Sequence, residues 1–228
     1  MDISIVIAVH NGEKFISRAV RSCLDQSFPR LDFEIIIVND GSTDRTLDCI
    51  APFKQFYAGL PPFLKVITLE ENMGIGYACN KGIEESLGQY VVRIDSDDYI
   101  HEKLLEIEFM FLQMNKDFDA VACDYFEVDE DGNTIRRMNV DKRPISSGLM
   151  FRKDRLLDIG LYDPDFKLME DEDLSYRFKK KYTIHRIPLP LYRYCKHGEN
   201  CTENKVALNE YSDKLMVKHP ELRNIALS

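Results

Sequence analysis

The sequence predicts an α/β fold with a mostly parallel central sheet flanked by helices, followed by a second half of α+β character. From residue 3 to residue 124, short β-branched apolar runs alternate with amphipathic stretches, which is typical of repeated strand–helix–strand units. The length of 228 residues suffices for one large core. With 44% hydrophobic and 30% charged residues, the composition excludes collagen-like, low-complexity and wholly disordered chains.

Five short apolar runs are the predicted strands of the first part of the chain. They cover residues 3–9, 33–38, 64–69, 90–94 and 119–124. Between the first two runs, apolar residues recur at helical spacing from Phe15 to Leu24, and Pro29 lies beyond the expected end of that helix. The same spacing in residues 75–87 and 104–114 brings the number of crossover helices predicted by periodicity to three.

The pattern changes after residue 124. The turn-forming pair Asp131-Gly132 separates two short runs at 125–128 and 134–136, which favours a hairpin over another crossover. The polar residues 141–147 are expected to form a loop, and two later segments are expected to be helices. These helices cover residues 171–180 and 205–217.

No internal repeat and no linker rich in Gly, Ser or Pro divides the chain. We therefore expect one domain over residues 1–204, with residues 205–228 as a C-terminal helical flank.

The charge balance argues against a nucleic-acid partner. The 30 Lys and Arg against 39 Asp and Glu give a net charge of −9, whereas binding to duplex phosphates requires a basic face. The basic residues between Arg177 and Lys196 allow two interpretations, contact with an anionic membrane that carries a lipid-linked acceptor or a solvated face.

A cytoplasmic location is expected, either free or at the inner face of a membrane. The apolar run at residues 1–9 is too short to span a bilayer and lacks the basic leader of a secretory signal. The six cysteines are widely spaced, and several fall at apolar-periodic positions, as expected for free thiols in a reducing compartment. They are Cys23, Cys49, Cys79, Cys123, Cys195 and Cys201.

Polar side chains follow four of the predicted strands. Because ligands of an open parallel sheet bind outside the carboxyl ends of the strands, these residues are expected to meet at one rim. The four segments are His10-Asn11-Gly12-Glu13, residues 39–44, residues 70–74 and Asp95-Ser96-Asp97-Asp98.

Two acidic clusters are the candidate catalytic groups. Three carboxylates within residues 95–98 repel one another unless a cation offsets them, and oxygen ligands suit Mg²⁺ or Mn²⁺. The alternative is a solvated acidic turn that caps the helix beginning near Glu102. The acidic residues 170–173 also allow two interpretations. They could cap the start of a helix, or one of their carboxylates could act as a general base.

Other nucleotide-binding motifs are absent or incomplete. Gly74-Ile75-Gly76 lacks the third small residue of the dinucleotide fingerprint because Cys79 stands there. The sequence has no G-x-x-x-x-G-K-[ST] P-loop. An aspartate-based phosphatase stays an outside alternative for the acidic cluster at 95–98.

In their order along residues 2–200, these motifs resemble those of the family 2 glycosyltransferases, which are inverting enzymes with the GT-A fold. Residues 4–13 are similar to the first strand and nucleotide loop of the family, with Ala8 where the family usually has Pro. Residues 34–44 are similar to the second motif, and Asn72-Met73-Gly74 with Asn80 resembles the third. Cys79 occupies a position where the family often has Arg, which puts one diphosphate contact in doubt.

The resemblance implies roles for individual residues. Asp40 would contact the base, Asp95 would lie near the ribose, and Asp171 would be the catalytic base. The implied metal ligands are Asp97 or Asp98, with His197 as a further ligand or as an ordinary loop histidine. The implied contacts to the nucleotide sugar are Ala8, His10, Asn11, Glu13, Asp40, Asn72, Gly74, Asn80, Asp95, Ser96, Gly148 and Glu170.

The function that the resemblance implies is transfer of a sugar from a nucleotide diphosphate sugar by a metal-assisted single displacement, and the expected donor is a UDP-sugar. The acceptor would be a carbohydrate or a lipid-linked molecule in bacterial surface polysaccharide or glycoconjugate synthesis. Residues 1–100 would be the nucleotide-binding half and 101–204 the acceptor half, and the flank could serve a homodimer contact. The alternatives are a nucleotide-sugar binding protein without activity and a sugar nucleotidyltransferase, which would need a Gly-rich basic loop after the first strand.

Overall fold

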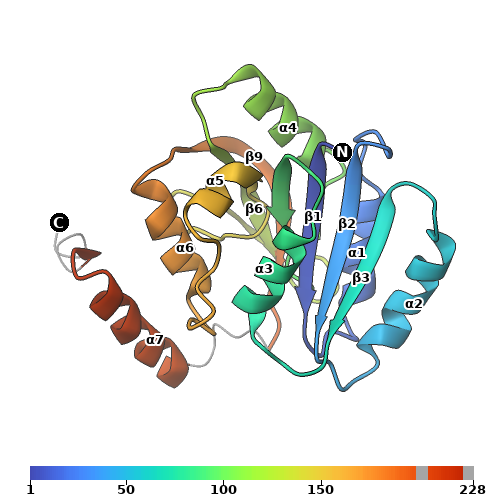
Figure 1. Cartoon of the computed structure of the whole chain (residues 1–228), viewed down its shortest axis with the longest axis horizontal. Helices are drawn as coiled ribbons and strands as arrows, with labels where there is room; N and C mark the ends of the chain where they lie inside the picture. Colours follow the sequence, from blue (N-terminus) through green and yellow to red (C-terminus); the bar gives the residue numbers. More distant parts are fainter. Residues whose placement is uncertain (199–204, 223–228) are drawn as a thin grey trace.

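The computed structural model describes residues 1–198 and 205–222, with the side chains of 205–208 excepted. Nine strands of the described chain form one sheet, with helices on both of its faces (Figure 1). The strands are β1 (Ile3–Val9), β2 (Phe33–Asp40), β3 (Phe63–Leu69), β4 (Tyr90–Arg93), β5 (Tyr99–Ile100), β6 (Ala120–Val128), β7 (Thr134–Met138), β8 (Met150–Arg152) and β9 (Ile184–Cys195). The helices are α1 (Ile16–Leu24), α2 (Thr46–Phe56), α3 (Ile75–Glu84), α4 (Leu104–Met114), α5 (Lys153–Asp158), α6 (Glu170–Lys179) and α7 (Lys205–Lys218).

The order of strands divides the sheet into a parallel and a mixed part. Strands β3, β2, β1 and β4 are neighbours and run parallel. Strand β8 is antiparallel to β4 and β6, and β9 is parallel to β6. Since β8 reverses direction between them, the carboxyl ends of β1, β2, β4 and β6 all point to the same edge of the sheet. This edge is where the polar segments of the first four predicted strands meet.

Alternation along β1 builds a core on each face of the sheet. Ile3, Ile5 and Ile7 pack on one face with α1 and α4, and Val6 and Ala8 pack on the other with α3 and α6. In Figure 1, α3 lies in front of the strands and α1 behind them. Both faces of the parallel strands are thus covered, which accounts for their continuous apolar sequences.

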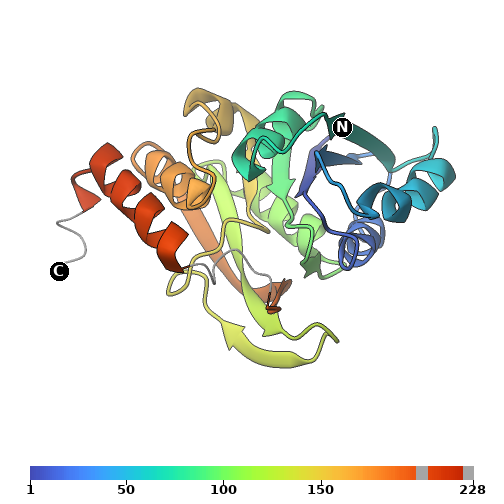
Figure 2. The ribbon, with the colours of Figure 1, turned by 90° about the horizontal axis from the view of Figure 1, so that it is seen from below.

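The structure confirms the predicted α/β class, the mixed second half and the hairpin. The strand predicted at 119–124 continues to Val128, and β7 pairs with it as the second arm of the hairpin. The loop expected at 141–147 contains no helix or strand, and the two predicted C-terminal helices are observed as α6 and α7. Figure 2 shows α7 lying beside α6 and the β6–β7 hairpin extending from the sheet.

The three helices predicted by periodicity are observed as α1, α3 and α4, and α2 is a fourth helix, between β2 and β3, that was not predicted. Only Thr46 and Ile50 of α2 are buried and Pro52 lies inside it, so the sequence carries a weak apolar periodicity and a residue that disfavours helices. Strand β9 was also missed. It contains Pro188 and Pro190, and its pairing with β6 shifts register, which breaks the alternation by which strands are recognised.

Five of the six cysteines are free in the described residues, and Cys201 lies outside them. The predicted domain boundary at residue 204 also lies outside the described residues and stays a prediction. Within the described parts of the chain, no helix is long and apolar enough to cross a membrane.

Candidate active site

A cavity of about 1190 Å³ opens at the edge of the sheet where β1, β2 and β4 end. The start of α6 forms its opposite side, and residues of α7 line it further out. Nine of the residues predicted to act in the site line this cavity. They are Ala8, His10, Asp40, Asn72, Gly74, Asp95, Asp97, Glu170 and Asp171.

Asp40, at the end of β2, organises the loop before α3. One of its carboxylate oxygens accepts a hydrogen bond from the backbone N–H of Met73 at 2.8 Å, and the other accepts one from Gly74 at 2.9 Å. Each oxygen keeps a second acceptor site. The ring of His10 is bonded to the carbonyl oxygen of Asp40 at 2.7 Å. The residues expected to contact the nucleotide therefore hold one another in position through these hydrogen bonds.

Asn11 and Glu13 join the loops after β1 and β2 and do not line the cavity. The side-chain oxygen of Asn11 accepts the backbone N–H of Thr43 at 2.8 Å, and Glu13 accepts that of Arg45 at 2.9 Å. Asn11 has a positive φ of 53°, which Asn tolerates better than most residues. In this structure both residues join the loop after β1 to the loop after β2.

Asn80, Gly148 and Ser96 also lie outside the cavity lining. Asn80 is bonded in both directions to the backbone of Tyr162, with its amide donating to the carbonyl at 2.7 Å and its oxygen accepting the N–H at 2.9 Å. Gly148 has φ +74°, and a Cβ there would overlap the ring of Tyr192. Asn80 and Gly148 therefore support the walls of the site.

Asp97 and His197 come from distant parts of the chain and meet at the cavity edge. The imidazole Nε2 lies 2.8 Å from Asp97 Oδ2, and the imidazole ring stacks on Phe15 with centroids 4.7 Å apart. Burial and the nearby Asp95 raise the pKa of Asp97, and the hydrogen bond from His197 opposes this rise. The pair therefore presents a carboxylate and an imidazole at one point.

Asp98 has a different environment from Asp97, although the two are adjacent. Its side chain is buried, one oxygen accepts the hydroxyl proton of Tyr192 at 2.6 Å, and the other accepts the backbone N–H of Cys195 at 2.7 Å. These contacts fix the end of β9, two residues before His197. Asp98 thus brings His197 to Asp97 and is not itself open to the cavity.

Arg93 joins the two acidic clusters. Its Nη1 lies 3.2 Å from Glu170 Oε1 and 2.5 Å from Asp171 Oδ1, and its Nε lies 2.9 Å from Asp95 Oδ1. Burial raises the pKa of Asp171 well above its usual range, and the Arg93 guanidinium counteracts this. The side chain of Asp171 is 24% exposed, so it reaches the open space of the cavity.

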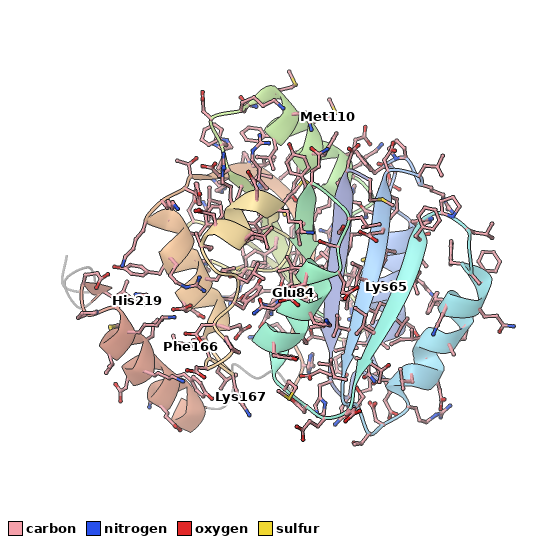
Figure 3. All side chains as sticks on the ribbon, viewed as in Figure 1. Lys65, Glu84, Met110, Phe166, Lys167 and His219 are labelled. Carbon is pink, nitrogen blue, oxygen red and sulfur yellow. The ribbon has the colours of Figure 1, made fainter. Side chains whose placement is uncertain are left out.

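The start of α6 sets the position of Glu170 and Asp171. Met169 adopts a left-handed conformation with φ 59°, and the helix begins at the next residue. All four residues of its first turn are acidic, which suits the positive end of the helix dipole. Asp173 faces away from the cavity and is fully buried against Arg177 of the same helix and Lys218 and His219 at the end of α7. In Figure 3, His219 lies between α7 and α6.

Arg93 was not identified from the sequence, although a signal for it was present. It is a charged residue within the otherwise apolar run Tyr90-Val91-Val92-Arg93-Ile94, and buried arginines need charged partners. Four other cations of the cavity lining were missed as site residues because they come from separate loops and helices. They are Arg143, Lys167, Lys179 and Lys196. Lys167 lies near the start of α6, on the side of the strand ends (Figure 3).

Within the described residues, no group of three His, Cys, Asp or Glu side chains is arranged to hold a metal ion. The carboxylate of Asp97 nevertheless suits Mn²⁺ or Mg²⁺, since such ions often bind one or two protein carboxylates and take their other ligands from water and substrate phosphates, and His197 beside it offers an imidazole nitrogen. The donor set therefore fits a metal that is completed by a diphosphate.

Known proteins with similar sequences are glycosyltransferases. A sequence profile described as glycosyl transferase family 2 matches residues 4–177. The chain is 34% identical over 113 residues to the poly(ribitol-phosphate) beta-N-acetylglucosaminyltransferase TarS of Staphylococcus aureus, a match to 49% of this chain and 19% of TarS. It is 28% identical over 243 residues to the uncharacterized glycosyltransferase YwdF of Bacillus subtilis, covering 96% of this chain and 84% of YwdF. The chain thus corresponds to about one fifth of TarS and to most of YwdF.

Two solved structures share the fold. The crystal structure of S. aureus TarS residues 1–349 in complex with UDP-GlcNAc has a TM-score of 0.76 at 23% identity, covering 90% of this chain and 61% of that one. The mannosyltransferase PcManGT from Pyrobaculum calidifontis in complex with GDP-Man and Mn²⁺ has a TM-score of 0.76 at 16% identity, covering 96% and 64%. These likenesses confirm the fold predicted from the sequence.

Proposed function

This chain belongs to glycosyl transferase family 2, and from that membership we propose that it transfers a sugar from a nucleotide diphosphate sugar to an acceptor hydroxyl. The observation that carries the proposal is the cavity itself. It brings together Asp40 and Asn72 at the strand ends and Asp171 at the start of α6. One open space thus holds the residues expected at the nucleotide and the residue expected to act as base.

In this proposal, Asp171 accepts the proton of the acceptor hydroxyl while the hydroxyl oxygen attacks the anomeric carbon. A single displacement of this kind inverts the anomeric configuration. The carboxylate is partly open to the cavity, as a base that must reach a substrate requires. Asp97 and His197 would hold the divalent metal, Mn²⁺ or Mg²⁺, which supplies positive charge to the diphosphate leaving group.

The proposed donor is a UDP-sugar. A TarS structure that shares this fold holds UDP-GlcNAc, and the mannosyltransferase of the same fold holds GDP-Man with Mn²⁺. The binding experiment therefore includes both UDP-sugars and GDP-sugars. A nucleotidyltransferase would need a Gly-rich basic loop after β1, whereas this loop reads His10-Asn11-Gly12-Glu13. A binding protein without activity would show donor binding without transfer.

The proposed acceptor is a carbohydrate or a lipid-linked molecule of a bacterial surface polymer. At about 1190 Å³, the cavity is larger than the ~300–1,000 Å³ usual for one small ligand, which leaves room for an acceptor beside the donor. The part of the cavity beyond Asp171 is formed by α6 and α7. Its lining there includes Lys179, Leu215 and Met216. The homodimer, the cytoplasmic location and the membrane contact stay predictions.

The first experiment measures thermal unfolding with a panel of nucleotide diphosphates and their sugars, each with Mn²⁺, with Mg²⁺ and without metal. A donor that binds the folded chain raises the unfolding temperature by ligand linkage. Asp97→Ala should abolish the metal-dependent part of that shift. Asp117→Ala is the matched control, because Asp117 is exposed in the turn before β6, away from the cavity.

Transfer is then measured with the stabilising donor by release of the nucleotide diphosphate in the presence of saccharide and lipid-linked acceptors. Stabilisation together with acceptor-dependent release supports the transferase. Stabilisation without release under any acceptor supports the binding protein. If no nucleotide diphosphate or sugar shifts the transition, the donor site is not where we place it.

A further inference from the structure

Arg93 is a buried cation shared by the two acidic clusters of the site. It ends β4 with 5% of its surface exposed, and its guanidinium contacts three carboxylates. Nε and Nη2 both lie 2.9 Å from Asp95 Oδ1. Nη1 lies 3.2 Å from Glu170 Oε1 and 2.5 Å from Asp171 Oδ1. A single side chain therefore connects the donor side of the cavity to the proposed base.

The surroundings of Arg93 fix its guanidinium in place. The ring of Tyr162 lies 5.5 Å from the guanidinium carbon, and Tyr162 is itself held through its backbone by Asn80. The carbonyl oxygen of Arg93 accepts the N–H of Gly148 at 2.8 Å. A planar guanidinium that is held from the ring side and the backbone side presents its donors in fixed directions.

The charge balance argues against a purely stabilising role. One guanidinium faces three carboxylates, so the cluster keeps a net charge of −2 if all of them are ionised, and burying such groups is costly even when they are paired. An apolar residue would serve the core of β4 at lower cost. The arrangement is better explained by what it does to Asp171.

Asp171 has one oxygen bound and one available. Its Oδ1 is held by Arg93, and among the described residues no donor is bonded to its Oδ2. A base on α6 that is anchored by one oxygen can direct the other toward an acceptor hydroxyl. Without the guanidinium, Glu170, Asp95 and Asp171 would repel one another, and Asp171 would lose both its orientation and the charge that favours its ionised form.

We propose that Arg93 is the positioning residue of the catalytic base, holding Asp171 toward the acceptor and linking it, through Asp95, to the donor side of the site. This inference rests on the proposed function. The proposed role requires a guanidinium group at position 93. A guanidinium can bridge Asp95 and Asp171 at once, whereas the single ammonium group of a lysine cannot reach both in the same geometry.

The test compares Arg93→Ala and Arg93→Lys with Arg152→Lys. Arg152 is a matched control because it is a partly buried arginine that lies opposite Tyr90 in the neighbouring strand β8 and bonds to the carbonyl oxygens of Phe118 and Leu112. It does not line the cavity. We expect kcat to fall about 100-fold in Arg93→Ala, as for loss of an effective general base, and less in Arg93→Lys. The KM for the donor should change little in both variants, because the lost interaction acts on the base.

A second measurement does not depend on turnover. In the ligand-free and metal-free protein labelled at its Asp carboxyl carbons, NMR follows the titration of Asp171, whose signal is assigned with Asp171→Asn. Removal of Arg93 should raise the pKa of Asp171, because the guanidinium lowers it. Arg152→Lys should leave it unchanged. The other groups that face Asp171 are not substituted in either variant, and they are Cys79, Asp95, Tyr162, Glu170 and Glu172.

The outcomes separate this inference from the proposed function. If the wild-type chain transfers no sugar with any donor, the proposed function fails, and the titration still decides whether Arg93 controls Asp171. If Asp171 titrates in Arg93→Ala as it does in the wild type, the inference is overturned. If Arg93→Ala does not fold, Arg93→Lys decides, and wild-type kcat together with a wild-type titration in that variant overturns the inference.

Discussion

The attachment of α7 to the helix that carries the proposed base can be tested through Asp173. This carboxylate is fully buried and lies 2.8 Å from Arg177 Nε, 2.6 Å from Lys218 Nζ and 2.8 Å from His219 Nε2. Asp173→Asn keeps the size of the side chain and removes its charge. Since Lys218 and His219 belong to the end of α7, the substitution weakens both α6 and its contact with α7.

The size of the effect follows from which partners are left without a contact. Breaking a buried ion pair costs about 3–5 kcal/mol. Arg177 keeps its hydrogen bonds to the carbonyl oxygens of Ile159 and Leu161, and Lys218 keeps its ion pair with Asp163 at 2.7 Å. The loss should therefore lie near the lower end, about 3 kcal/mol, or about 6–12 °C in unfolding temperature for a chain of this size.

The stability difference between the wild type and Asp173→Asn is expected to depend on pH in a definite direction. Burial opposes ionisation of Asp173, but the hydrogen bonds from Lys218, His219 and Arg177 outweigh it and hold its pKa below the usual value. A lowered pKa in the folded state stabilises the protein above the unfolded pKa, and this stabilisation is lost as pH falls through the folded pKa. The difference between the wild type and Asp173→Asn should be full at neutral pH and shrink in acid, below the pKa of an ordinary aspartate.

The assay is urea unfolding of both proteins at neutral pH and at a series of acidic values. Asp154→Asn is the control, because Asp154 pairs with Arg155 at the surface with 68% of its side chain exposed, where a salt bridge contributes little. A free energy of unfolding for Asp173→Asn that matches the control, or a difference from wild type that grows in acid, would refute the reasoning.

Three further predictions concern the cavity and its walls. Asp171→Asn should lower kcat by about 10²–10⁴-fold without changing donor binding, and because burial raises the pKa of Asp171, the acid limb of the wild-type pH–rate profile should lie above the pH expected of an ordinary aspartate. A wild-type rate in this variant would exclude Asp171 as the base. Asp98→Asn should weaken the metal-dependent thermal shift by loosening the end of β9, since Tyr192 and Cys195 lose a carboxylate partner; unchanged metal dependence would exclude this role. Gly148→Ala should destabilise the fold by about 1–3 kcal/mol in urea unfolding, because φ is +74° and the added Cβ meets the Tyr192 ring, and a stability equal to wild type would contradict the packing described for Gly148.

The acidic residues of the site show why neighbours in sequence differ in role. Asp97 and Asp98 belong to one run of carboxylates, and the sequence left open which of them would hold the metal. Asp98 is buried because β9 passes over it and supplies two donors, whereas Asp97 faces His197 at the cavity edge. We therefore propose the metal role for Asp97 and His197 alone. The sequence contains no local signal for this difference, because Tyr192 and Cys195 are nearly a hundred residues away.

The parallel half of the sheet was determined by the sequence alone, and so was the rim at its carboxyl end. The reason is that β-branched apolar runs and helical periodicity are local patterns, and the geometry of parallel strands then brings the residues that follow them to one edge. The order of motifs along the chain likewise predicts Asp40 and Asp171 as site residues. These parts of the protein depend on short-range patterns and on a general rule of topology.

Only the tertiary structure decided what each polar side chain contacts. Arg93 joins Asp95 to Asp171 because β4 ends beside the start of α6, 77 residues later in the chain, as the ion pair with Glu170 shows. The end of α7, which adds a wall to the cavity, meets α6 through the buried carboxylate of Asp173. Hydrogen bonds and ion pairs between distant segments produce no periodic pattern in a sequence, so the sequence does not identify the partner of a buried charge. The proposed roles of Arg93, Asp98 and Asp173 therefore depend on the tertiary structure.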